Sequence, residues 1–91
     1  MLNYYYSSSV QKFISSSKNE IIGTMVVNGR QEFTLEQQLA WEEQIDLLQV
    51  QLNQIPGQIF FEFSIPRMGK RVDCILIHGN IVFVLEFKVG Q

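Results

Sequence analysis

Residues 71–89 read RVDCILIHGNIVFVLEFKV, in which two apolar segments flank the dipeptide Gly79-Asn80. Their β-branched and aromatic residues predict two strands, Arg71 to His78 and Ile81 to Val89. Glycine at the first central position of the two-residue connection favours a type II′ hairpin turn. Because the apolar runs are nearly continuous, we expect the sheet to be covered on both faces.

A strand and a long helix are predicted upstream of this hairpin. Ile59 to Ile65 has a strand-like composition, and Pro66 to Lys70 reads as the turn that joins it to the hairpin. Thr34 and Gln37 fit a capping box, which marks the start of a helix. Apolar residues then recur at helical spacing up to about Asn53: Leu35, Leu39, Trp41, Ile45, Leu48 and Leu52.

The N-terminal third is predicted to be helical. Ser7 to Ser9 are good N-cap residues for a short helix, and Asn19 to Val27 form a second amphipathic stretch. The sequence therefore predicts a single α/β (α+β) domain in three parts. Residues 1–33 form an N-terminal helical segment, residues 34–53 the core helix, and residues 58–89 a three-stranded antiparallel meander.

Composition narrows the possible classes of protein. Hydrophobic residues make up 46% of the 91 residues, which indicates a folded domain rather than a disordered chain. Nine Asp and Glu against seven Lys and Arg give a net charge of −2, which excludes nucleic-acid binding through bulk charge. One Cys and one His exclude a disulfide framework and a Cys/His zinc site. Without a long apolar run or a signal-peptide pattern, we expect a cytoplasmic protein with no membrane partner.

The predicted hairpin brings two carboxylates together. A two-residue turn at 79–80 pairs residues whose numbers add up to 159, so Asp73 faces Glu86 and Lys88 lies on the same face. Two like charges about 5 Å apart repel each other by roughly 3 kcal/mol at an effective dielectric constant of about 20. A divalent cation, a shared proton or the ammonium group of Lys88 would offset this repulsion. Two carboxylates are suitable ligands for Mg²⁺ or Mn²⁺.

Further charged residues extend this candidate site. Glu42 lies within the apolar arc of the long helix, so the helix is expected to deliver it to the same place. Three carboxylates and a lysine suit metal-assisted hydrolysis of a phosphodiester, in which the metal polarises the phosphate and lowers the pKa of a bound water. The cations that precede Asp73 would then hold phosphates: Arg67, Lys70 and Arg71.

Asp73, followed after twelve residues by Glu86-Phe87-Lys88, resembles the signature of the PD-(D/E)xK nuclease superfamily. The core of that family is a helix, a three-stranded meander, a second helix and a fourth strand. The predicted helix and meander match the beginning of this order. Residues 61–73 and 84–90 more specifically resemble the N-terminal domain of bacterial proteins that carry a Schlafen-like P-loop helicase/ATPase region downstream.

This resemblance implies a function and a set of roles. Asp73 and Glu86 would be metal ligands, Lys88 the catalytic lysine, and Glu42 the helix carboxylate of a nuclease dependent on Mg²⁺ or Mn²⁺. The implied substrate is nucleic acid, with DNA favoured over RNA, and a downstream ATPase region is implied in the parent protein. Since the second helix and fourth strand have no counterpart in the sequence, we expect a truncated restriction-endonuclease-like core.

The same residues allow plainer interpretations. Asp73 and Glu86 form a solvated strand face if they simply pair with their neighbours Arg71 and Lys88. Glu42 is then a surface residue of the helix, and the basic turn is an ordinary solvated turn.

Three other polar residues are expected to lie outside the site. By strand alternation Glu62 should point away from the face that carries Asp73, Cys74 should pack in the core, and His78 should be structural or exposed. The alternative function is a non-catalytic module of the same fold that docks nucleic acid or regulates a fused ATPase. A further alternative is an interaction domain whose open hairpin edge pairs with another chain. Self-association, for example as a dimer, is expected of a fragment with exposed apolar sheet surface.

Overall fold

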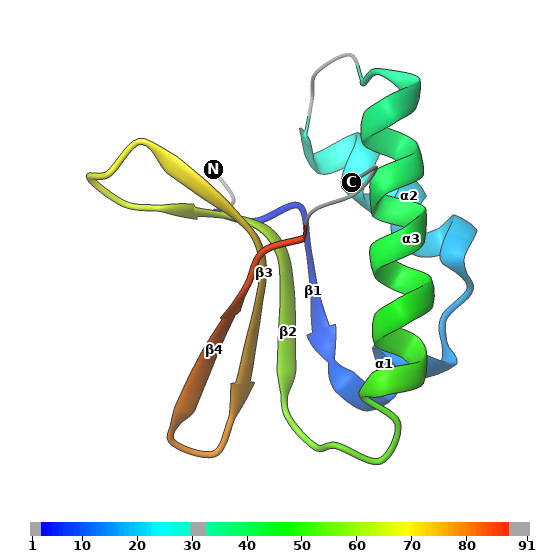
Figure 1. Cartoon of the computed structure of the whole chain (residues 1–91), viewed down its shortest axis with the longest axis vertical. Coiled ribbons are helices and arrows are strands. Elements are labelled where there is room, and N and C mark those ends of the chain that lie inside the picture. Colours follow the sequence, from blue (N-terminus) through cyan, green and yellow to red (C-terminus); the bar gives the residue numbers. More distant parts are fainter. Residues whose placement is uncertain (1–2, 30–32, 88–91) are drawn as a thin grey trace.

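Helices and an antiparallel sheet make up the computed structural model, which describes residues 3–29 and 33–87. In chain order the elements are β1 (Tyr6–Ser9), α1 (Val10–Ser15), α2 (Lys18–Gly29), α3 (Leu35–Gln51), β2 (Gln58–Ile65), β3 (Lys70–His78) and β4 (Ile81–Leu85). The strands lie in the order β1-β2-β3-β4, each antiparallel to its neighbour. The helices gather beside β1 and β2, whereas β4 forms the far edge of the sheet (Figure 1).

The fold is α+β, as predicted, but the sheet has four strands instead of three. Tyr6 pairs with Phe61 and Ser9 with Gln58, so a segment expected only to cap a helix adds β1 to the edge of β2. Ser9 is also the cap of α1, since its hydroxyl accepts a hydrogen bond from the backbone N–H of Lys12 at 3.1 Å. The prediction of three strands was wrong because a strand of four residues, YSSS, is too short and polar to show an alternating pattern.

The β3–β4 hairpin has the predicted register. Cys74 pairs with Leu85 and His78 with Ile81, the alignment set by a two-residue turn at Gly79-Asn80. Within this turn only the glycine has a positive φ, 61°, as a type II′ turn requires. His78 is exposed, one of the two outcomes predicted for it, and its Nδ1 forms a 2.7 Å hydrogen bond with the backbone carbonyl of Pro56.

Side-chain caps explain where the two longer helices begin. Thr34 Oγ1 accepts a hydrogen bond from the backbone N–H of Gln37 at 3.0 Å, which confirms the predicted start of α3. Ser17 and Glu20 form a reciprocal capping box before α2, with N–H donors 3.1 and 3.3 Å from their acceptors. α3 ends at Gln51, slightly before its predicted end. None of the helices in the described residues is long and apolar enough to cross a membrane.

The hydrophobic core lies between the helices and the inner face of the sheet. Trp41 and Ile45 of α3 are fully buried, and they belong to the same cluster as the fully buried Ile59 and Phe61 of β2. Cys74 of β3 is buried there as well, as predicted, and burial raises the pKa of its thiol to about 12. The thiol is therefore neutral at physiological pH and packs as a small apolar group.

The far edge of the sheet remains open within the described part of the chain. The side chains of Ile81 to Val84, all large and apolar, are exposed along β4. Residues 3–29 and 33–87 therefore do not cover the sheet on both faces, in contrast to the expectation from its apolar runs. Self-association through this surface stays a prediction.

Gly57 is predicted to be the glycine most sensitive to substitution. It has φ 148° immediately before β2, and a Cβ at this position would collide with the carbonyl oxygen of Ile77 on β3. We expect Gly57→Ala to lower the free energy of unfolding by about 2–3 kcal/mol, measured by chemical denaturation.

Gly23→Ala is the matched control, because no neighbouring atom lies within 4 Å of the added Cβ in α2. Alanine is also the better helix former, so this variant should be neutral or more stable by about 0.5–1 kcal/mol. Equal losses of stability in the Gly57 and Gly23 variants would contradict this account of the close approach between β2 and β3.

Candidate functional site

Three carboxylates lie side by side across the sheet. Asp73 of β3 is the middle one. The pairings on either side of it place Glu62 of β2 across from it in one direction and Glu86, which follows β4, in the other. Glu62, Asp73 and Glu86 are called the carboxylate row below.

A hydrogen bond fixes the relation between Asp73 and Glu86. β4 ends at Leu85, before the predicted end at Val89. Directly after β4, the backbone is bonded to the side chain of Asp73 instead of to the backbone of β3. Asp73 Oδ2 accepts a hydrogen bond from the backbone N–H of Phe87 at 2.8 Å. This bond holds the chain after β4 against β3 and so keeps Glu86 next to Asp73.

The carboxyl groups of Asp73 and Glu86 repel each other. Partial loss of hydration raises the pKa of Glu86, and the nearby charge of Asp73 raises it further. The ammonium group of Lys70 acts in the opposite direction and lowers this pKa. Since Glu86 is exposed and Asp73 half-buried, the pair is open to a ligand from solvent.

Glu62 belongs to the row, so the prediction that it points away from Asp73 was wrong. The turn before β3 is one residue shorter than predicted, because Ile65 pairs with Lys70. A shift of register by one residue reverses which side chains share a face. A four-residue turn from Pro66 to Gly69 was the signal in the sequence that would have placed Glu62 opposite Asp73.

The backbone of Glu62 explains why this carboxylate is buried. Its φ of 53° lies in the left-handed region and interrupts the alternation of β2. The rings of Phe60 and Phe63 accordingly lie 5.7 Å apart although they are three residues from each other. Glu62 is only 8% exposed, and it lines a cavity together with Trp41 of α3.

Burial raises the pKa of Glu62 to about 7, and the neighbouring charge of Asp73 contributes to the rise. The guanidinium group of Arg71 and the indole N–H of Trp41 lower this pKa without cancelling the effect of burial. Trp41 Nε1 nevertheless has no hydrogen bond of good geometry to any residue that the structure describes. The indole N–H is therefore near the carboxylate but is not satisfied by it.

The basic turn contributes two of its three cations to the row. Lys70 acts on Glu86 and Arg71 acts on Glu62, and the guanidinium carbon of Arg71 also lies 4.8 Å from the centroid of the Tyr5 ring. Arg67 is exposed at the tip of the turn with φ 70° and affects neither shifted carboxyl group. The predicted catalytic residue Lys88 lies outside the described residues.

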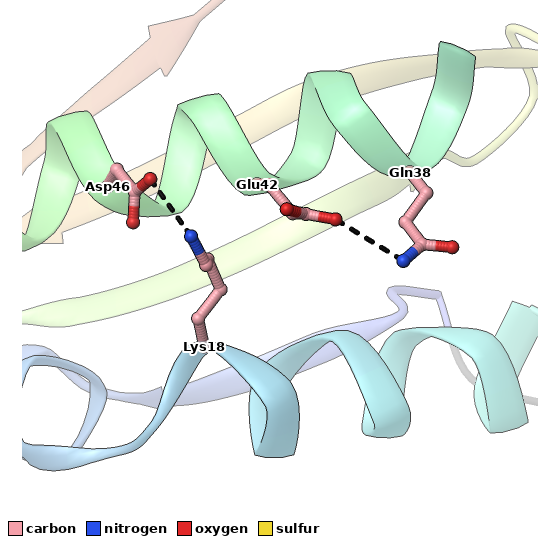
Figure 2. Close-up of polar contacts among 4 residues, drawn as sticks. All are labelled: Lys18, Gln38, Glu42 and Asp46. Atoms are coloured by element: carbon pink, nitrogen blue, oxygen red, sulfur yellow. Dashed lines mark hydrogen bonds and ion pairs between the residues drawn. The ribbon is translucent and has the colours of Figure 1, made fainter. Parts of the chain in front are cut away.

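Glu42 does not join the carboxylate row. Its carboxylate accepts a hydrogen bond from Nε2 of Gln38 at 3.3 Å, on the side of α3 that faces α2 (Figure 2). On the same side Lys18 and Asp46 form an ion pair at 3.1 Å between α2 and α3 (Figure 2). The residue that α3 brings to the row is Trp41, for which the sequence pattern favoured a packing role.

Asp73 and Glu86 are the residues of the row that could hold a divalent metal ion together. Within residues 3–29 and 33–87 no group of three or more His, Cys, Asp or Glu side chains is arranged to hold a metal ion. Mg²⁺ is commonly bound through one or two carboxylates, with waters and substrate phosphates completing its octahedral shell. Asp73 and Glu86 meet this requirement, because they are adjacent oxygen donors whose mutual repulsion a cation would relieve.

The raised pKa of Glu62 predicts that stability falls as the pH rises. Between the usual glutamate pKa of 4.5 and the folded-state value of about 7, the folded protein keeps a proton that the unfolded chain has released. We expect the free energy of unfolding, measured by chemical denaturation, to be about 2–3 kcal/mol higher at about pH 5 than at about pH 8.

Substitution separates this contribution from that of other groups. Glu62→Gln should lose most of the pH dependence and keep a smaller part of the same sign from Glu86, whose pKa is also raised. Glu43→Gln, at an exposed position of α3, should behave like the wild type. An unchanged pH dependence in Glu62→Gln would show that Glu62 is not the buried titrating group.

Comparisons of the chain with protein-family models, with curated proteins and with solved structures gave no significant match. The assignment of function therefore depends on the side chains of the carboxylate row and their surroundings.

Proposed function

We propose that the domain supports metal-dependent hydrolysis of phosphodiesters in nucleic acid, with Asp73 and Glu86 as the ligands of a Mg²⁺ or Mn²⁺ ion. The observation that carries the proposal is the hairpin register, which together with the hydrogen bond from Phe87 N–H to Asp73 keeps these two acidic residues next to each other at the end of the β3–β4 hairpin. Folding gains nothing from holding two carboxylates together, whereas a cation bound between them would turn their repulsion into attraction.

The hydrogen bond from Phe87 supports Asp73 as a ligand. It engages Oδ2 and thereby fixes the orientation of the carboxylate, whereas Oδ1 has no hydrogen bond to the residues that the structure describes and would face the cation. A supporting hydrogen bond of this kind is a common feature of metal-binding carboxylates. A bound divalent ion would polarise the phosphate and lower the pKa of a water molecule at neutral pH.

The basic residues next to the row support the proposal, because they would bind the phosphates of the substrate. Lys70 and Arg71 flank the carboxylates from the start of β3, where they would hold phosphates on either side of the scissile bond. By resemblance to the PD-(D/E)xK nucleases, Lys88 would stabilise negative charge that develops on the phosphate. The same resemblance favours DNA over RNA as the substrate and a helicase/ATPase region in the parent protein.

A non-catalytic docking module is the second candidate. It is favoured by the small number of carboxylate ligands in the described residues and by the position of Glu42 on the side of α3 that faces α2. Such a module would bind nucleic acid through Lys70 and Arg71 without a metal, and its affinity would fall steeply with salt concentration.

Calorimetric titration with Mn²⁺ and Mg²⁺ tests the proposed metal site. We expect the wild type to bind and Asp73→Ala to lose at least about tenfold in affinity, because a direct ligand is removed. Asp46→Ala is the matched control, since Asp46 is an exposed aspartate whose partner is Lys18 on the other side of α3. Circular dichroism confirms that each variant is folded.

Two results would contradict the metal site. One is a folded wild type that binds neither ion, which leaves the docking module as the better candidate. The other is equal binding by the wild type and Asp73→Ala, which would place the cation elsewhere on the acidic surface.

A further inference from the structure

A small cavity lies next to the carboxylate row, between the first half of α3 and the sheet. Its volume is about 120 Å³, and its walls include the aromatic side chains of Tyr5, Phe33 and Trp41. Glu62 lies at its inner end, where it is buried, and the exposed Arg71 lies at its rim. The cavity therefore runs from the surface to the buried carboxylate of the row.

One buried polar group of the cavity lining lacks a hydrogen-bond partner among the described residues. Trp41 is only 1% exposed, and its Nε1 has no hydrogen-bond partner among the described residues. Glu62 is 8% exposed as a whole residue, and its carboxylate is not among the buried side-chain groups of the described residues that lack a partner. Buried polar groups in native proteins are nearly always paired, so the unpaired indole N–H at the inner end of the cavity indicates that something else completes it.

We propose that this cavity binds a single unstacked nucleobase. The volume agrees with one aromatic ring system, since a cavity of about 150 Å³ in another protein takes up benzene. The three aromatic side chains pack edge to face on one another, and Arg71 covers the ring of Tyr5, so a base in the cavity would contact the parts of the rings that line it. The Glu62 carboxylate would accept a hydrogen bond from the edge of the base, and the Trp41 indole N–H would donate one to it.

The charges around the cavity select this class of ligand. A cationic ligand would approach the guanidinium group of Arg71 at the rim, and an anionic group would approach the Glu62 carboxylate inside. A planar, neutral ligand with both donors and acceptors on its edge fits between them, and its attached phosphate would meet Arg71. The inference rests on the proposed function, because it gives the nuclease site a subsite for an unpaired base beside the scissile phosphate.

The carboxylate predicts a preference among bases. Cytosine presents an amino group at the position where thymine presents a carbonyl oxygen, and glutamate accepts a hydrogen bond from that amino group. Thymine would instead place an acceptor against an acceptor. We therefore expect deoxycytidine to bind about tenfold more tightly than thymidine, which is the lower end of the discrimination that such a contact gives.

Trp41 makes the test direct, because it is the only tryptophan of the chain and lines the cavity. Its fluorescence is titrated with deoxycytidine and with thymidine in EDTA at about pH 8, above the Glu62 pKa of about 7. Both titrations are corrected for absorption by the nucleoside. Neutral nucleosides avoid repulsion by the row, and EDTA makes the result independent of the metal site.

Variants assign the preference to the cavity. Glu62→Gln should reduce the preference for deoxycytidine to less than about twofold, whereas Glu43→Gln on the exposed side of α3 should retain it. Phe33→Leu removes an aromatic side chain from the cavity wall and should weaken the binding of both nucleosides. This variant gives a second test if Glu62→Gln does not fold. Arg71→Gln should weaken binding of dCMP but not of deoxycytidine.

Two further ligands, dCMP and a short oligomer of deoxycytidine, show whether the bound base belongs to a nucleic-acid strand or to a free nucleotide. If the oligomer binds more tightly than dCMP, the ligand is a strand, and if the two bind equally, it is a free nucleotide. Both results support a binding site for a base. The inference is overturned if neither nucleoside gives a saturable change, if deoxycytidine and thymidine bind equally, or if Glu62→Gln keeps the preference. Metal binding by Asp73 and Glu86 can succeed or fail independently of each result.

Discussion

The antiparallel register of β2, β3 and β4 is the constraint on which the rest of the structure depends. A two-residue turn sets the β3–β4 alignment and a four-residue turn sets the β2–β3 alignment, and together they bring Glu62, Asp73 and Glu86 to one level of the sheet. A slip of one residue in either turn would move a carboxylate to the other face and disperse the row. The same alignments place Ile59, Phe61 and Cys74 on the inner face, so core packing and the candidate site fix each other.

The carboxylate row lowers the stability of the folded state. Glu62 sits in the left-handed region of the backbone and its carboxylate is buried next to a second carboxylate, which raises its pKa to about 7. Arg71 and the indole of Trp41 offset this cost only in part, and the indole N–H itself has no partner in the described part of the chain. Strained backbone, perturbed pKa values and unpaired polar groups gather at functional sites, whereas a purely structural sheet has no use for them.

Periodic patterns in the sequence predicted the elements whose signal extends over many residues. They predicted α3 and the register of the β3–β4 hairpin, whose pairing runs up to Cys74 and Leu85, the residues that adjoin Asp73 and Glu86. The prediction failed for Glu62, whose position depends on the local geometry of the backbone. A one-residue difference in a turn and a left-handed φ placed Glu62 in the row, and neither is visible in a hydrophobic pattern. The predicted apolar arc of α3 included Leu35 and Leu39, which are 71% and 48% exposed, so the arc was too wide and wrongly took in Glu42.

Paramagnetic broadening by Mn²⁺ in an NMR spectrum of the whole chain tests the central claim most directly, because it locates a bound cation residue by residue. A cation held by the carboxylate pair should broaden the backbone amide signals of Asp73, Cys74, Glu86 and Phe87 first, at substoichiometric Mn²⁺, with Glu62 close behind. Signals of the acidic face of α3 around Glu42 and Asp46 should remain sharp at the same concentration. Broadening that is centred on that face, or that affects acidic residues throughout the chain equally, would contradict a metal site built by the strand register.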